Sequence, residues 1–224
     1  MFKSRYLIIF FLLITGSIRL NAQDKELKLG LRAGHNAVFG GFAAASFEGM
    51  GHFNPDFSIS GGVQYNSIGK TAVEARPTYH KQVDSGKLSV ETLLAYTNLS
   101  SLNSCSFGVG AALDFERARI KLGYYCRLYG GQGDVITEPF NIYYELKVHC
   151  LKNAEDVYLD FVITNCEIFE LERHYQPSFI AEGSFNPTDK MRFSFGIGYK
   201  PAGMFHIAAD YYQTFIKTGI CYRW

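Results

Sequence analysis

The sequence predicts an all-β chain that folds as a closed, antiparallel transmembrane β-barrel of about twelve strands, connected as an up-and-down meander. Three observations lead to this prediction. The chain begins with an export signal, nearly all of the rest alternates between apolar and polar residues, and glycine and aromatic residues recur at regular places in the alternating segments. No internal repeat or linker divides the chain, so residues 23–224 are expected to form one barrel domain.

Residues 1–22 have the layout of a secretory signal peptide. A basic stretch with Lys3 and Arg5 precedes an unbroken apolar run of about nine residues, and small and polar residues follow up to Ala22. The alternative, a membrane-anchoring helix, would need roughly 20 apolar residues. Charged or glycine residues interrupt every later apolar run. We therefore expect cleavage after Ala22, leaving either a barrel in a bacterial outer membrane or a soluble exported protein.

The region after Asp24 alternates with a period of two, which is typical of β-strands with one apolar and one polar face. In residues 190–200 the odd-numbered positions are apolar, whereas Arg192 and Ser194 lie at even-numbered positions. Segments of roughly ten residues are long enough to cross a bilayer as tilted strands. The twelve expected segments are 26–36, 42–53, 57–67, 87–97, 104–114, 118–129, 138–150, 156–167, 176–186, 190–200, 203–212 and 214–224. Ten strands is the alternative count, because the second and eighth segments alternate weakly.

Two stretches break the alternation and are expected to be loops. Residues 69–86 contain Pro77 and many charged residues, and residues 168–175 are also irregular. An even number of strands places both chain ends in the periplasm and closes the sheet without an edge. If the first strand starts in the periplasm, loop 69–86 lies outside the cell, where barrels of this kind carry their longer loops. An extracellular ligand is therefore expected to bind at loop 69–86.

The composition excludes several classes of function. The net charge is +1 and 19% of the residues are charged, below the roughly 25% of soluble domains, so the basic excess of a nucleic-acid-binding surface is missing. The five cysteines form an odd set without C-x-x-C spacing, and we interpret them as small apolar strand residues rather than a disulfide framework. The six histidines lack metal-ligand spacing, so neither a metal nor another cofactor is expected.

A soluble β-sandwich also alternates, but three features favour a barrel. The polar faces carry charges at strand centres, among them Lys28, Arg32, Glu91 and Glu182. Glycines recur on the same faces, as a narrow interior requires where strands curve or long side chains need room. Phenylalanine and tyrosine concentrate near the expected strand ends, as in the aromatic girdles at membrane interfaces. We therefore expect the apolar faces to contact lipid and the polar faces to line a lumen.

The last eight residues carry the most specific motif. Lys217 is a polar residue, Gly219 follows two positions later, and Tyr222 and Trp224 are aromatic residues at the third-last and last positions. This pattern resembles the assembly signal of outer-membrane barrels, which implies that the barrel assembly machinery recognises the last strand. Together with the signal peptide and the alternation, it makes the chain similar to the outer-membrane β-barrel superfamily, of the small OmpA-like or porin-like kind. The resemblance is one of architecture and implies no particular activity.

The charged residues expected to line the lumen lie mainly on three consecutive segments. They are Arg119, Lys121, Arg127, Glu145, Lys147, Asp160 and Arg192. Opposite charges on neighbouring strands pair readily, so one interpretation is a lumen filled and stiffened by ion pairs. The other is a passage in which the basic segment 118–129 favours small anions. A barrel of about twelve strands lies between the filled eight-stranded kind and the open porins, and both interpretations fit it.

No catalytic constellation is found in the sequence. The glycine pairs 108/110 and 196/198 are not followed by a helix, and no G-x-S-x-G motif occurs. The leading hypothesis is a non-enzymatic integral outer-membrane protein that acts as a narrow channel or has a structural or surface-interaction role, with membrane lipid and small solutes as partners. An outer-membrane lipid-modifying enzyme is the alternative, since His149, His174 or His206 could lie near a membrane interface. A soluble periplasmic β-sandwich is the second alternative.

Overall fold

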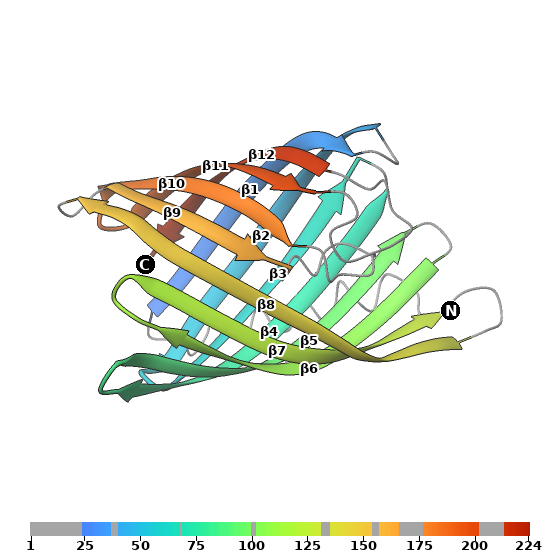
Figure 1. Cartoon of the computed structure of the whole chain (residues 1–224), viewed down its shortest axis with the longest axis horizontal. Helices are drawn as coiled ribbons and strands as arrows, with labels where there is room; N and C mark the ends of the chain where they lie inside the picture. Colours follow the sequence, from blue (N-terminus) through green and yellow to red (C-terminus); the bar gives the residue numbers. More distant parts are fainter. Residues whose placement is uncertain are drawn as a thin grey trace.

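In the computed structural model, twelve antiparallel strands form one closed barrel in meander order (Figure 1). The structure describes residues 24–36, 40–67, 69–99, 102–130, 135–153, 157–165, 177–201 and 213–224. The strands are β1 (Asp24–Asn36), β2 (Gly40–Asn54), β3 (Phe57–Asn66), β4 (Lys70–Val83), β5 (Gly86–Leu99), β6 (Leu102–Asp114), β7 (Ala118–Gly130), β8 (Val135–Asn153), β9 (Val157–Thr164), β10 (Ser178–Thr188), β11 (Met191–Lys200) and β12 (Gln213–Arg223). Over these ranges there is no helix with the length and apolar character to cross a membrane.

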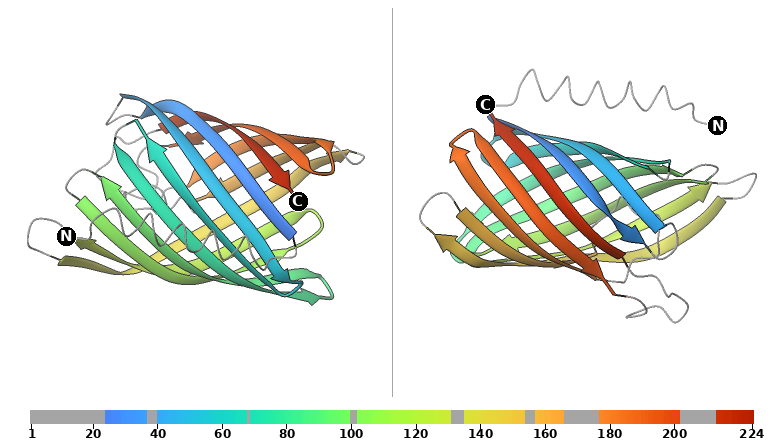
Figure 2. Two further views of the ribbon diagram at one scale, coloured as in Figure 1. Left: turned by 180° about the vertical axis from the view of Figure 1, so that it is seen from behind. Right: turned by 90° about the horizontal axis from the view of Figure 1, so that it is seen from above.

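The barrel closes where β1 pairs with β12, and Figure 2 shows these two strands side by side. The pairing runs to the end of both strands. The Lys25 amide donates to the Trp224 carbonyl at 3.2 Å, the Trp224 amide donates to the Lys25 carbonyl at 3.1 Å, and Arg223 forms an ion pair with Glu26. Closure leaves no sheet edge, which is the condition for a sheet to lie in lipid. The predicted fold class is confirmed, and the sandwich alternative is wrong.

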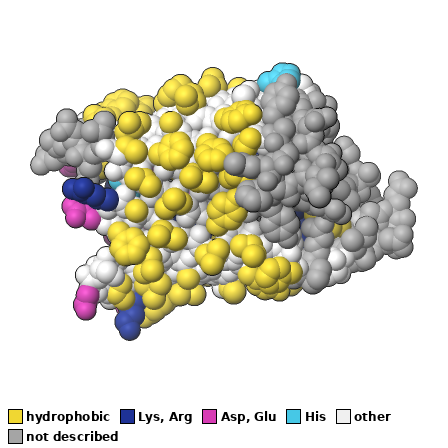
Figure 3. All heavy atoms as spheres, in the orientation of Figure 1, with side chains coloured by type: hydrophobic (Ala, Val, Ile, Leu, Met, Phe, Trp, Pro, Cys, Tyr) yellow, Lys and Arg dark blue, Asp and Glu magenta, His cyan; other side chains and the backbone are white. Residues whose placement is uncertain are grey.

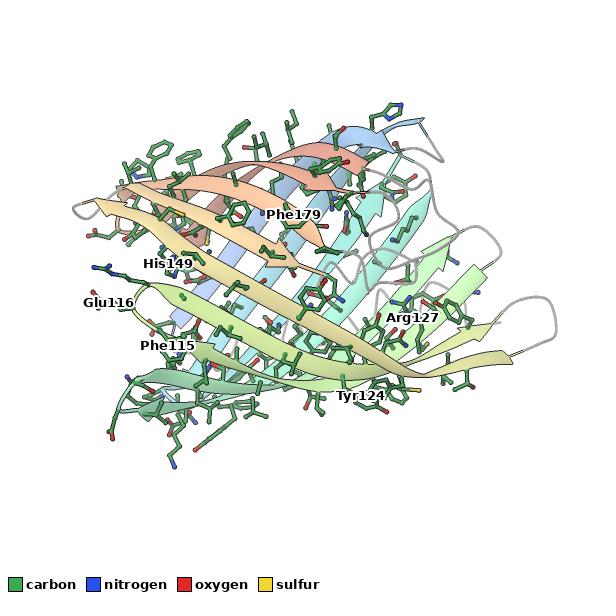
Figure 4. The ribbon with its side chains drawn as sticks, viewed as in Figure 1. Phe115, Glu116, Tyr124, Arg127, His149 and Phe179 are labelled. Atoms are coloured by element: carbon green, nitrogen blue, oxygen red, sulfur yellow. The ribbon has the colours of Figure 1, made fainter. Side chains whose placement is uncertain are left out.

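The barrel wall is apolar outside and polar inside, the reverse of a soluble protein. On β7 the apolar Leu122 is 62% exposed, whereas Lys121 on the opposite face is only 5% exposed. Figure 4 shows Tyr124 on the outside of the same strand and Arg127 on the inside. Apolar side chains cover the outer wall in the view of Figure 3. Such a wall suits contact with lipid outside and a polar lumen inside.

The two rims of the barrel differ. Two-residue turns join β2 to β3, β4 to β5 and β10 to β11 at the rim that holds the ends of β1 and β12. Short turns are typical of the periplasmic side of bacterial barrels, so we refer to this rim as the periplasmic rim and to the other as the extracellular side. Three aromatic pairs lie on the outer wall at this rim, with ring centroids 5.9, 5.3 and 5.7 Å apart: Phe53 with Phe57, Phe185 with Phe193, and Tyr222 with Trp224. Aromatic residues thus gather at strand ends on this rim, as an interfacial girdle would require.

The predicted loop 69–86 is wrong, because residues Lys70–Val83 form β4. Its outward face carries Thr71, Ala75 and Pro77, which are polar, small or lack a backbone N–H, and these residues obscured the alternation. The ladder to β5 skips from Ala75 to Thr78, around the proline. The turn that follows β4 lies at the periplasmic rim. Residues 69–86 therefore do not form an extracellular loop that could bind a ligand.

The predicted count of twelve strands is confirmed, and the alternative of ten is wrong. The two weakly alternating segments, 42–53 and 156–167, correspond to β2 and β9. The predicted strand 203–212, the predicted loop 168–175 and the signal peptide 1–22 lie outside the described residues. In the described barrel, β4 takes the place in the count that the prediction gave to 203–212.

Substitutions on one outward face test whether the wall lies in lipid. Val109, near the middle of β6, and Leu113, near its periplasmic end, both point outward and are exposed. Val109→Arg should lower the free energy of unfolding in lipid vesicles by about 2–4 kcal/mol, whereas Leu113→Arg should cost about 0–1 kcal/mol, because the cost of an arginine falls toward the interface. Urea titrations of the folded protein in vesicles would measure both. Equal losses for the two variants would contradict a membrane-spanning wall.

Candidate functional site

The lumen contains a cavity of about 410 Å³ that is lined largely by polar and charged residues. Most of them belong to β1–β4 and β10–β12, and β7 and β8 contribute one each. The charged lining residues are Lys28, Arg32, Glu48, Glu74, Arg76, Lys121, Glu145, Glu182 and Lys217. Five of these are basic and four are acidic, so the lining is nearly balanced in charge. This composition suits water, ions and small hydrophilic solutes rather than apolar ligands.

Glu91 on β5 connects four strands at one side of the lumen. Its Oε1 lies 2.6 Å from Lys121 Nζ on β7 and 3.5 Å from Arg76 Nη1 on β4, and it accepts a hydrogen bond from the Tyr143 hydroxyl on β8 at 3.1 Å. Arg76 also contacts Glu74 at 3.0 Å. Glu91 and Lys121 are buried, and a buried carboxylate requires such compensation.

Glycines allow Tyr143 to reach Glu91 across two intervening strands. Glu91, Gly110, Gly123 and Tyr143 are lateral neighbours on β5, β6, β7 and β8. A Cβ atom at Gly110 would meet the Tyr143 hydroxyl oxygen at 2.1 Å, and one at Gly123 would meet the ring Cζ at 2.1 Å. The tyrosine ring therefore lies flat over both glycines, and it packs in one buried cluster with Leu93 and Tyr125. The predicted role of interior glycines, to make room for long neighbours, is confirmed here.

On β11, too, an interior glycine lets a long side chain reach a partner on a non-adjacent strand. Lys217 on β12, Gly196 on β11 and Glu182 on β10 are lateral neighbours, and Lys217 extends over the glycine to form an ion pair with Glu182. One layer toward the extracellular side, Phe215 covers Gly198 and packs with Ile180 and Val162. The Arg32 guanidinium lies over the Phe215 ring at 3.6 Å from its centroid. The arginine is thus held against the wall by a cation–π contact.

The Lys28–Glu48 pair differs from the Glu91 network in its exposure. Lys28 Nζ lies 3.6 Å from Glu48 Oε2, and the two side chains are 47% and 38% exposed. Both residues line the cavity, on the neighbouring strands β1 and β2. An ion pair exposed to water contributes at most about 1 kcal/mol to stability, so these two charged groups are available to other ions in the lumen.

The remaining predicted residues form separate contacts on the inward faces of the strands. Arg119 pairs with Asp114 at 3.4 Å and with Glu145 at 3.5 Å. Asp160 contacts Lys147 Nζ and His149 Nδ1, each at 2.6 Å.

Arg127 and Arg192 bind neutral oxygens instead. Arg127 is buried and donates hydrogen bonds to Ser106 at 3.2 Å, to Tyr129 at 3.0 Å and to Tyr125 at 3.4 Å. Arg192 donates to the Asn186 side-chain oxygen at 3.0 Å.

Of the seven predicted lumen residues, only Lys121 and Glu145 line the cavity. Charges on the opposite side were missed for different reasons. Glu74 and Arg76 fell in the predicted loop, and Lys217 was interpreted only as part of the assembly motif. Lys28, Arg32 and Glu182 were recognised as polar-face charges, but no pattern in the sequence placed them at a cavity. The interpretation of segment 118–129 as an anion passage loses support, since acidic groups compensate Arg119 and Lys121 and Arg127 lies away from the cavity.

The C-terminal motif divides between the two faces of β12. Lys217 and Gly219 face the lumen and line the cavity, whereas Tyr222 and Trp224 are exposed on the outer wall at the periplasmic rim. Their rings stack with centroids 5.7 Å apart.

The structure describes four of the five cysteines, and Cys105, Cys126, Cys150 and Cys221 are free thiols. Cys166 lies outside the described residues. Within the described ranges, no group of three or more histidine, cysteine, aspartate and glutamate side chains could hold a metal ion.

Comparison with known proteins gives similarity in fold. No family model matches the chain, and no curated protein matches it in sequence. Among solved structures, a KdgM porin in complex with disordered oligogalacturonate matches with a TM-score of 0.56 and 14% identity, over 87% of this chain and 98% of that one. A NanC porin matches with a TM-score of 0.59 and 11% identity, over 87% and 98% of the two chains. The translocator domain of the autotransporter NalP from Neisseria meningitidis matches with a TM-score of 0.60 and 8% identity, over 99% and 96%.

These similarities show that the chain has the fold of outer-membrane β-barrel proteins, as the sequence predicted. Porins and a translocator domain share this fold, so function has to be argued from the lumen itself.

The Glu91 network should stabilise the barrel. Glu91→Gln is expected to lower the free energy of unfolding by about 3 kcal/mol, because it removes the carboxylate shared by Lys121 and Arg76 in a buried environment. Glu48→Gln is the matched control and should cost less than about 1 kcal/mol, because its pair is exposed. Urea unfolding in detergent micelles, followed by circular dichroism, would measure both. A loss no greater for Glu91→Gln than for Glu48→Gln would show that the network does not stabilise the fold.

Proposed function

We propose that this protein is a narrow, non-enzymatic channel through which ions and small hydrophilic solutes cross the outer membrane. The observation that carries the proposal is the cavity of about 410 Å³, lined by nine charged side chains, inside a closed barrel. A barrel with a purely structural role would be expected to fill this volume with interlocking side chains. In this barrel such packing is found around Tyr143, on the other side of the lumen. The shared fold with the KdgM and NanC porins supports the proposal.

The balanced lining supports weak selection by charge. Single-sign rings of side chains favour ions of the opposite sign. Here each sign is represented on the lining, and basic groups have acidic neighbours, as in the Lys28–Glu48 and Lys217–Glu182 pairs. We therefore propose that the channel admits both cations and anions.

Conductance measurements test the channel. The purified protein in planar lipid bilayers should give discrete conductance steps. Ser46 lines the cavity on β2, so Ser46→Trp should reduce the step size several-fold, because an indole ring would occupy a large part of the space. Ser46→Ala is the matched control and should conduct like the parent.

Each negative result has its own meaning. Absence of steps together with release of fatty acid from lipid would replace the channel by an outer-membrane lipid-modifying enzyme. Absence of both activities would leave a structural or surface-interaction role.

We also propose that the chain is exported with removal of residues 1–22 and that the barrel assembly machinery recognises its last strand. The outward-facing, stacked pair of Tyr222 and Trp224 at the periplasmic rim supports this second proposal. Aromatic side chains at this position are accessible to a factor that approaches the barrel from the periplasm.

The assembly proposal predicts that loss of the last aromatic ring impairs insertion in cells but not refolding of the purified protein. Trp224→Ala should reduce the amount of protein inserted in the outer membrane several-fold, while the same purified variant refolds in detergent with the yield of the parent. Trp224→Phe keeps an aromatic ring and should insert normally. An equal loss of refolding in detergent would assign Trp224 to stability instead of recognition.

A further inference from the structure

We infer that the passage runs off the barrel axis, along the wall formed by β11, β12, β1, β2 and β3, and that the Lys28–Glu48 pair sets its ion selectivity. This inference rests on the proposed channel function. Of the many charged groups in the lumen, those of Lys28 and Glu48 are the ones that a permeating ion meets.

Small residues form a continuous row across this wall. Ser194, Gly219, Gly30 and Ser46 are lateral neighbours on β11, β12, β1 and β2, and all four line the cavity. The row ends at β3, where the longer side chain of Gln64, the next lateral neighbour, also lines the cavity. Over the two glycines and two serines the wall is little thicker than its backbone. The free volume of the lumen therefore lies against this side.

The neighbours of these glycines explain why the row is not covered. At Gly110 and Gly123 the lateral neighbour is Tyr143, whose ring fills the space above both. Gly30 and Gly219 instead have Ser46 and Ser194 beside them, and the nearest side-chain atoms to their added Cβ positions are the two hydroxyl oxygens, at 2.5 and 3.0 Å. A hydroxymethyl group is too short to lie across a neighbouring strand. The Lys28 Cε, 3.8 Å from the added Cβ position at Gly219, lies at the edge of this space. The space above Gly30 and Gly219 therefore belongs to the cavity.

The opposite wall is thick and closed. Leu93 and Tyr143 are completely buried, and Tyr125 is nearly so. Lys121 and Glu91 extend toward each other over β6. Because these side chains interlock, an ion has no room to pass between them. At the level of Gly30 and Gly219 the free volume is thus displaced toward β1 and β12. One layer toward the extracellular side, Arg32 and the buried Phe215 narrow it.

Lys28 and Glu48 are placed where ions would pass. They are lateral neighbours on β1 and β2, two residues closer to the periplasm than Gly30 and Ser46, so the pair borders the row of small residues. Their side chains are 47% and 38% exposed, against 6% and 9% for Lys121 and Glu91. Lys217 and Glu182 are in closer contact and are less exposed. The Lys28–Glu48 pair is therefore the one whose two charges interact most readily with a passing ion.

Reversal potentials across a potassium chloride gradient test this assignment. Lys28→Gln should shift the permeability ratio toward cations, and Glu48→Gln should shift it toward anions. Each change should be about two- to fivefold, the effect of a unit charge acting through water at a few ångströms. Lys190→Gln and Asp189→Asn are the matched controls, since they remove the same charges from the exposed turn between β10 and β11. These controls should leave the ratio unchanged, because salt screens charges at the rim.

Cysteine accessibility provides a second measurement that leaves the charges in place. Ser46→Cys should lose conductance when a methanethiosulfonate reagent is added to the bath. Ser106→Cys, which is buried beside Arg127 on the opposite wall, should not respond. Both variants are made in a Cys221→Ser background, because the free Cys221 is the lateral neighbour of Lys28 on the proposed passage, and that background gives the baseline.

The outcomes separate the two proposals. A parent protein without conductance would overturn the channel. A conducting parent in which Lys28→Gln and Glu48→Gln change selectivity no more than the rim controls would keep the channel and overturn this inference. Modification of Ser106→Cys in place of Ser46→Cys would do the same, by locating the passage at the other wall.

Discussion

Backbone hydrogen bonding between the first and last strands is the constraint on which the rest of this structure depends. Lipid offers no partner for a backbone N–H or C=O, so the sheet has to close, and the β1–β12 pairing closes it. Once the sheet is closed, a strand side chain can point only outward to the lipid or inward to the lumen. That choice explains why Leu122 is exposed although it is apolar, and why Lys121 beside it is buried although it is charged.

Closure also fixes the register, and the register decides which interior groups meet. Lys217 reaches Glu182 because Gly196 lies between them on β11, and Tyr143 reaches Glu91 because Gly110 and Gly123 lie between them. A slip of one residue would turn every one of these side chains to the lipid. Interior glycines therefore act as spacers that let long side chains bridge non-adjacent strands. Where the lateral neighbours of a glycine are only serine and glycine, as at Gly30 and Gly219, the same absence of a side chain leaves a cavity.

The period-two pattern was sufficient to predict the barrel and eleven of its twelve strands, and the predicted number of twelve was reached by counting 203–212 in place of β4. It failed at β4, where Thr71, Ala75 and Pro77 on the lipid face weaken the contrast between the two faces. It also could not locate the cavity. The alternation indicates that Lys28 and Lys121 both point inward. Lys28 is half exposed and Lys121 is buried because their neighbours on other strands differ. Those neighbours are set by the register and the closure, which involve residues far apart in the sequence.

The division of the lumen into a thick and a thin wall gives the interior charges two different roles. On the thick side, burial makes a charge without a partner costly, so Glu91 is surrounded by Lys121, Arg76 and Tyr143, and the network holds β4, β5, β7 and β8 together. On the thin side, water weakens the attraction between Lys28 and Glu48, and the pair adds little to stability. Charges that contribute little to the fold are the ones that remain available to act on a solute. Stability and selectivity are thus assigned to opposite walls of the barrel.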